Sequence, residues 1–107
     1  MPQYNEVPYH NMWHGFGVFQ GCYWALTQCQ EIRKGFTTQD QFALLVAAIC
    51  HDTNHDGVNN PFHVAVCSEI ALVYNDTSVL ESMHTRKCFE TAREKGCEIF
   101  AGYASRF

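Results

Sequence analysis

An apolar run of nine residues, 42–50, ends directly at the polar pair His51-Asp52. The run is too short to cross a bilayer. It is apolar almost all round a helix, so we expect a helix that is buried in a protein core. An imidazole and a carboxylate at the end of such a helix are costly to bury unless they are paired or bound to a metal. The most apolar segment of the chain therefore leads into a candidate metal site.

The composition fits one small domain. A length of 107 residues leaves no room for a second domain, and 47% apolar residues predict a packed core rather than disorder. The formal net charge is −4 and the lysines and arginines do not cluster, which argues against a nucleic-acid or anionic-membrane partner. The N-terminus has no basic segment followed by an apolar stretch, so we predict no signal peptide and no membrane segment in this chain.

Six cysteines are spread along the chain without a C-x-x-C pair. This spacing fits neither a zinc ribbon nor a redox motif. No export signal supports a disulfide framework, so we expect buried free thiols in a cytoplasmic helical protein. Any membrane association is expected to come through regions outside this chain.

No stretch alternates apolar and polar residues for long enough to predict a strand, so the fold class is predicted to be all-α. We expect about four helices, over residues 9–30, 37–51, 60–74 and 79–95. Gly15, Gly17 and Gly21 weaken the first of these or let another helix pack closely against it. Trp13 and Trp24 are expected in the core.

Start and stop signals mark the expected helix ends. Thr37 and Asp40 have the positions of an N-cap and an acidic first turn. Asn60 before Pro61 predicts a cap followed by the first helical residue. Residues 75–78 form a break and a new cap, and Gly96 is expected to stop the last helix.

Two histidine pairs, His10/His14 and His51/His55, have the i, i+4 spacing that places side chains on one helix face. Together with Asp52 they offer the nitrogen and oxygen ligands that Zn²⁺ accepts. The sequence therefore predicts that these side chains converge on a metal.

Calcium is a competing prediction for the same segment. Asp52, Asn54, Asp56 and Gly57 match the opening of an EF-hand loop. The twelfth position of that loop should be a glutamate and is His63 here, so the closing bidentate ligand is missing. This disfavours a calcium site.

Three motifs in order resemble the class I 3',5'-cyclic nucleotide phosphodiesterase family. They are Tyr-His-Asn-x-x-His at 9–14, His-Asp-x-x-His-x-Gly-x-x-Asn at 51–60, and Tyr-Asn-Asp-x-Ser-Val-Leu-Glu at 74–81. The resemblance covers residues 9–100. It implies a partial multi-helix, HD-type catalytic domain over 1–107, truncated at both ends, that hydrolyses cAMP or cGMP to the 5'-monophosphate in cyclic-nucleotide signalling.

The resemblance also implies roles for single residues. His14, His51 and Asp52 match zinc ligands, and Asp52 also matches the carboxylate that bridges to a second ion, Mg²⁺ or Mn²⁺. His10 matches the general acid and Glu81 the carboxylate that orients it, so we expect a hydrogen bond or close contact between these two side chains. Three further residues match positions near the metals or on the substrate side: Tyr9, His55 and Asn60.

The chain also departs from the family pattern. Residues 82–84 are Ser-Met-His where the family has Asn-His-His. The family's fourth zinc ligand, an aspartate, and its purine-binding residues have no counterpart here. We therefore expect the isolated chain to be inactive. The alternatives are a non-catalytic binding module, which associates with the missing portion of the domain or with itself, and another metal-dependent phosphohydrolase.

Overall fold

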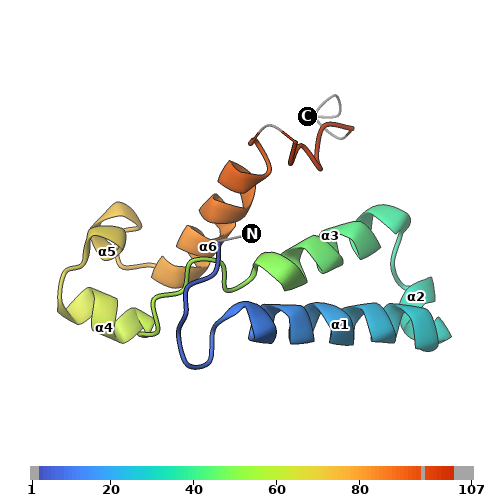
Figure 1. Ribbon diagram of the computed structural model, residues 1–107, viewed down its shortest axis with the longest axis horizontal. Helices are drawn as coiled ribbons and strands as arrows, with labels where there is room; N and C mark the ends of the chain where they lie inside the picture. The colour runs from blue at the N-terminus through green and yellow to red at the C-terminus, as the bar shows by residue number, and fades with distance from the viewer. Residues whose placement is uncertain (1–2, 95, 103–107) are drawn as a thin grey trace.

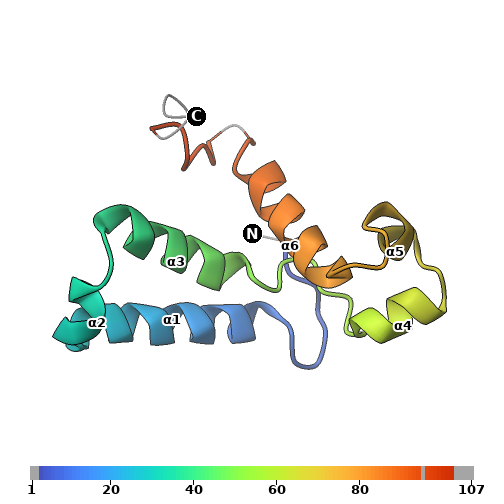
Figure 2. The ribbon, with the colours of Figure 1, turned by 180° about the vertical axis from the view of Figure 1, so that it is seen from behind.

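The computed structural model describes residues 3–94 and 96–102, and this part of the chain contains helices and no strand (Figure 1). The helices are α1 (Met12–Gln28), α2 (Gln30–Lys34), α3 (Thr38–Cys50), α4 (Asn60–Ala65), α5 (Glu69–Val73) and α6 (Val79–Thr91). Figure 2 shows α1 and α3 side by side and antiparallel, with the short α2 at their turn and with α4 and α5 at the opposite end of the molecule. The predicted all-α class is confirmed.

The predicted number of about four helices is too low, because two expected helices are each divided. The first begins only at Met12, where the Asn11 side chain accepts hydrogen bonds from the N–H groups of Trp13 and His14. It breaks at Cys29, whose backbone is extended. The expected helix over 60–74 breaks at Cys67, which has a left-handed backbone with φ of 50°, and Ser68 then caps α5. The last helix ends at Thr91, and the expected end at residue 95 lies outside the described residues.

The helix caps explain two of the boundaries. Thr37 and Asp40 form the predicted start of α3 as a reciprocal capping box, and the hydrogen bonds from Thr37 lower the pKa of Asp40. At α4 the capping residue is Asn59, which accepts from the Phe62 N–H at 3.0 Å, and Asn60 is already helical. The prediction that Asn60 caps this helix is therefore wrong by one residue.

The core is small. Its buried apolar side chains are Leu26, Ala48, Ala71, Val79, Leu80, Met83 and Ala92. The expectation that the helix before His51 is buried on all sides is wrong, since Ala48 is the one buried residue of α3. Trp13 and Trp24 also lie outside the core, with 82% and 62% of their surfaces exposed. None of the helices in the described residues has both the length and the apolar character needed to cross a bilayer.

The cysteines are free, as expected, but they are not fully buried. All six lie in the described residues, five of them half-buried and Cys67 exposed. The reason is the same as for α3: this small core encloses few side chains completely.

The segment before α1 lies across the loop that follows α3. The Tyr4 hydroxyl donates to the Ile49 carbonyl at 2.8 Å, and the Asn54 N–H donates to the Gln3 carbonyl at 2.7 Å. The Asn5 amide donates to the His55 carbonyl at 3.0 Å. These bonds hold the His51–His55 region against the start of the chain.

Candidate metal centre and active site

His14, His51 and Asp52 converge on one point between α1 and the end of α3. The Nε2 atoms of the two histidines are 3.2 Å apart. Asp52 Oδ2 lies 3.2 Å from His14 Nε2 and 3.1 Å from His51 Nε2. Two ring nitrogens and a carboxylate oxygen at such mutual distances favour a cation between them, and this donor set suits Zn²⁺.

Local structure orients these ligands. His51 stands at the C-cap of α3, and its Nδ1 donates to the Ala48 carbonyl at 2.8 Å. That bond places the proton on Nδ1 and leaves the Nε2 lone pair facing Asp52, as is typical of metal-binding histidines. Asp52 follows His51 directly in the sequence, and only 8% of its surface is exposed. The residues present therefore fit a bound metal ion.

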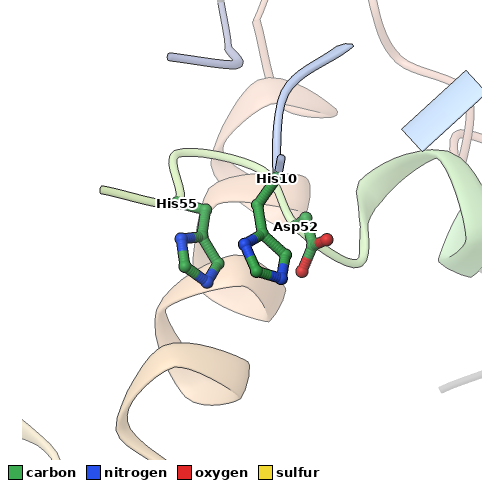
Figure 3. Close-up of side chains that lie close together, drawn as sticks. All are labelled: His10, Asp52 and His55. Atoms are coloured by element: carbon green, nitrogen blue, oxygen red, sulfur yellow. The ribbon is translucent and has the colours of Figure 1, made fainter. Parts of the chain in front are cut away.

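A second group, His10, Asp52 and His55, shares the same carboxylate (Figure 3). One ligand atom from each residue lies within 4.8 Å of the others. The His10 ring stacks on the His55 ring with a centroid distance of 4.0 Å and an interplanar angle of 9°. His10 precedes α1 and His55 lies in the loop after α3, so neither pair stands on a single helix as the spacing suggested.

His55 is held by its own loop. The Gly57 N–H donates to His55 Nδ1 at 2.9 Å, and Gly57 has a φ of 92°, which glycine adopts without strain. Burial lowers the pKa of His55, and the proximity of the His10 imidazole lowers it further. Both effects favour the neutral form of this imidazole.

Glu81 binds Asn60 instead of His10. The Asn60 amide donates to both carboxylate oxygens of Glu81, at 3.3 and 3.0 Å, and this lowers the pKa of Glu81. Among the described residues no hydrogen bond joins Glu81 to His10, so the expected hydrogen bond between them is not formed. His10 and Glu81 do line one cavity of 550 Å³, together with His55 and Asn60.

Tyr9 lies at the edge of this arrangement. Its side chain is 64% exposed, and its ring centroid is 4.6 Å from that of His14. It covers one side of a candidate metal ligand.

His84 is a residue whose role the motifs left open. It is 4% exposed, its Nδ1 donates to the Thr53 carbonyl at 2.7 Å, and its Nε2 lies 3.9 Å from Asp52 Oδ1. It therefore faces the carboxylate oxygen that His14 and His51 do not use. The signal was present in the sequence, because His84 retains the last histidine of the family's Asn-His-His.

The carboxylates of the calcium-like motif do not gather around one point. Asp52 turns toward His14 and His51, whereas Asp56 pairs with His63 at 3.3 Å. His63 is buried, and its other ring nitrogen lies 3.0 Å from the Ser68 hydroxyl. This geometry agrees with the sequence in disfavouring calcium.

Comparisons with known proteins agree with the geometry. The sequence profile described as 3'5'-cyclic nucleotide phosphodiesterase matches residues 9–106. The 3',5'-cyclic-nucleotide phosphodiesterase regA of Dictyostelium discoideum is 44% identical over 94 residues, which is 88% of this chain and 12% of that protein. The human high affinity cGMP-specific 3',5'-cyclic phosphodiesterase 9A is 38% identical over 98 residues, 92% of this chain and 16% of that protein.

A solved structure also superposes well. It is the phosphodiesterase domain of the RhoPDE fusion protein from the choanoflagellate Salpingoeca rosetta, with a TM-score of 0.83 and 43% sequence identity. The match covers 92% of this chain and 31% of that domain. This chain thus spans about a third of the solved domain and less than a fifth of the two relatives.

Proposed function

This chain belongs to the 3',5'-cyclic nucleotide phosphodiesterase family, and on that premise we propose that its histidine–aspartate cluster is part of a site for metal-dependent hydrolysis of a cyclic nucleotide. The substrate is cAMP or cGMP and the product is the 5'-monophosphate, in cyclic-nucleotide signalling in the cytoplasm. The observation that carries the proposal is the convergence of His14, His51 and Asp52 within 3.2 Å of one another.

In this proposal His14, His51 and Asp52 would hold Zn²⁺, and Asp52 would also serve a second ion, Mg²⁺ or Mn²⁺. Metal ions at such a site supply Lewis acidity and lower the pKa of water. Asp52 is suited to both contacts because one oxygen faces the two histidines while the other lies toward His84.

His10 is proposed to give a proton to the leaving 3'-oxygen. Its stacking on the His55 ring fixes the orientation of its imidazole. Asn60 and Glu81 line the same cavity and contribute polar groups to it. Glu81 lines the cavity while its carboxylate is hydrogen-bonded to Asn60. To orient His10, it would need a rearrangement of this bond or a group that bridges the two side chains.

A second candidate function is a non-catalytic binding module. The observation that favours it is the exposure of large aromatic side chains along α1, including Trp13 and Trp24. The occupant of this surface would be the rest of a catalytic domain or a second copy of the chain. Zinc binding without any contribution to hydrolysis in a longer protein would support this second function.

Metal content tests the proposed site. We expect the purified chain to retain zinc after dialysis, and we expect Asp52→Asn and His51→Ala to reduce the retained zinc by at least tenfold, since each removes one of three converging ligands. Asp76→Asn is the matched control, because Asp76 is an exposed carboxylate in the turn before α6. Equal zinc in the wild type and in the double variant His51→Ala/Asp52→Ala would rule the site out.

Activity is a separate test. We expect negligible hydrolysis of cAMP and cGMP by the 107 residues alone, because the chain corresponds to 31% of a solved phosphodiesterase domain. The measurement is turnover with added Zn²⁺ and Mg²⁺. Robust metal-dependent turnover that is lost in His10→Ala would contradict this expectation while supporting the role of His10.

A further inference from the structure

A serine, a histidine and an aspartate outside the candidate metal ligands form a hydrogen-bonded chain. His63 Nδ1 lies 3.0 Å from the Ser68 hydroxyl oxygen, and His63 Nε2 lies 3.3 Å from each carboxylate oxygen of Asp56. A hydroxyl, an imidazole within hydrogen-bond reach of it, and a third group that orients the imidazole are the parts of an activated nucleophile. The proposed hydrolysis of a cyclic nucleotide uses none of these three side chains.

The end of α4 brings Ser68 back to His63. Cys67 has a left-handed backbone with φ of 50°. The N–H groups of Cys67 and Ser68 donate to the carbonyls of Val64 and His63, at 3.1 and 3.0 Å. This is the Schellman pattern, which folds the chain back over the last helical turn. The backbone therefore holds the Ser68 side chain within reach of an imidazole five positions earlier.

The hydrogen-bond partners determine where the protons lie. An ionised carboxylate can only accept, so the neutral His63 ring donates its Nε2–H to Asp56 and keeps a lone pair on Nδ1. The Ala71 N–H donates to Ser68 Oγ at 3.2 Å. The hydroxyl proton of Ser68 is then directed to His63 Nδ1, and the Ala71 N–H favours negative charge on the oxygen that loses it.

Burial differs between the base and the nucleophile. His63 is 4% exposed, so its imidazole is held in place, whereas Ser68 is half-buried and accessible from solvent. Ser82 on α6 is also half-buried, and among the described residues no hydrogen bond joins its hydroxyl to a histidine. It is therefore a matched serine without a base.

We propose that Ser68 is a nucleophile that a small carboxylic ester acylates, with His63 as its base and Asp56 as a positioning residue. The Ser68 oxygen attacks the carbonyl carbon, and the hydroxyl proton passes to His63 Nδ1. Asp56 stabilises the imidazolium. The bond between the carbonyl carbon and the leaving oxygen then breaks, and His63 returns the proton to that oxygen. One hydroxyl and one ester thus yield an acyl serine and an alcohol.

Labelling with an alkyl fluorophosphonate tests the nucleophile. The Ser68 oxygen attacks phosphorus, the P–F bond breaks, fluoride leaves, and the proton passes to His63. The 107-residue chain is treated with the probe in the presence of EDTA, and the adduct is located by peptide mass spectrometry. We expect one dominant adduct, on Ser68, in the folded chain and none in urea. Prior treatment with p-nitrophenyl acetate should slow the labelling, because acetylation occupies the same oxygen.

Four variants assign the roles. Ser68→Ala should abolish the adduct and Ser82→Ala should leave it unchanged. His63→Gln should slow labelling by about a hundredfold or more, since the base is lost. Asp56→Asn should slow it several-fold without changing Tm, because the amide oxygen can still accept from His63 while the negative charge is gone. The Asp56 side chain is 47% exposed, so this variant decides the matter if His63→Gln does not fold.

Several results would overturn the proposal. They are an absence of any adduct, a dominant adduct on Cys67 or Ser82, equal labelling of the folded and unfolded chains, no protection by p-nitrophenyl acetate, and an unchanged rate in folded His63→Gln or in Asp56→Asn. Because EDTA removes bound metal, labelling of Ser68 is independent of zinc. A failure of this proposal and a failure of the metal site are therefore observed separately.

Discussion

Gly15 follows the candidate ligand His14 on α1 and is buried against the segment that precedes the helix. A Cβ at this position would meet the hydroxyl of Tyr4 and would lie 2.7 Å from Tyr4 Cζ. Tyr4 cannot move away freely because its hydroxyl donates to the Ile49 carbonyl. The close approach anticipated for the glycines of the first helix is therefore made at Gly15 by an N-terminal tyrosine rather than by a helix.

Substitution of two neighbouring glycines should have opposite effects. Gly15→Ala should lower the free energy of unfolding by about 1 kcal/mol net, because steric strain exceeds the gain in helix propensity. Gly17→Ala should raise it by about 0.5–1 kcal/mol, since nothing lies within 4 Å of a Cβ there. Urea unfolding followed by circular dichroism measures both changes.

The tyrosine contact supplies the control for this pair. If Tyr4 causes the penalty, Gly15→Ala should become neutral or stabilising in a Tyr4→Ala background. A loss of the same size in both backgrounds would show that the packing argument is wrong.

Among the elements, α4 and α6 are joined by the side chain of Asn60. Its amide oxygen accepts from the Leu80 N–H at 2.9 Å, and its amide nitrogen donates to Glu81. Ser78 stands at the N-cap of α6 with a left-handed φ of 44° and makes no capping hydrogen bond through its side chain. Asn60, which precedes Leu80 by 20 positions, therefore caps α6, and it also lines the cavity that His10 and Glu81 share.

Asn60→Ala should lower the free energy of unfolding at pH 7 by about 1–2 kcal/mol, because one cap and the bonds to Glu81 are lost. Asn60→Asp should lower the free energy of unfolding by less, because its carboxylate still accepts a hydrogen bond from the Leu80 N–H. Its repulsion of Glu81 offsets part of this benefit. Part of the difference is pH-dependent. The pKa of Glu81 is lowered in the folded wild type, so this contribution is present above the ordinary value of 4.5 and is lost as the pH falls through the folded pKa.

Urea unfolding at pH 7 and below pH 4 measures this effect. The gap between the wild type and Asn60→Ala should be smaller at the lower pH. A gap that widens on acidification would show that Glu81 does not contribute through Asn60.

The whole molecule is elongated, with extents of 45 × 32 × 25 Å and a radius of gyration of 15.6 Å. A compact domain of this length has a radius of gyration of about 13 Å. Large apolar side chains are exposed along one long helix, namely Met12, Trp13, Phe16, Tyr23 and Trp24. This surface is wider than the scattered apolar residues of an ordinary monomer, so it favours association.

We expect the chain to associate as its concentration rises. Trp13 and Trp24 should be quenched efficiently by acrylamide in dilute solution and less efficiently in concentrated solution, as their rings become covered. Light scattering on the same samples supplies the mass. Trp13→Gln/Trp24→Gln should shift association to higher concentration, whereas Tyr74→Phe, which is remote from this face, should not. Unchanged mass across the concentration range would contradict this expectation.

The sequence by itself determined the helical class, the capping box at Thr37 and Asp40, the family, and the residue types that gather at Asp52. These features depend on local spacing, on backbone donors within one turn, and on the ligand chemistry of imidazole and carboxylate. Only the tertiary structure decided that Asn60 binds Glu81, that His10 stacks on His55, and that His84 faces Asp52. Each of these contacts joins segments at least 20 residues apart, where helix packing rather than local pattern selects the partner. The same reason explains why the apolar helix before His51 is not buried on all sides. Its hydrophobicity predicts that its surface needs packing partners, but tertiary packing decides whether the rest of the chain supplies them.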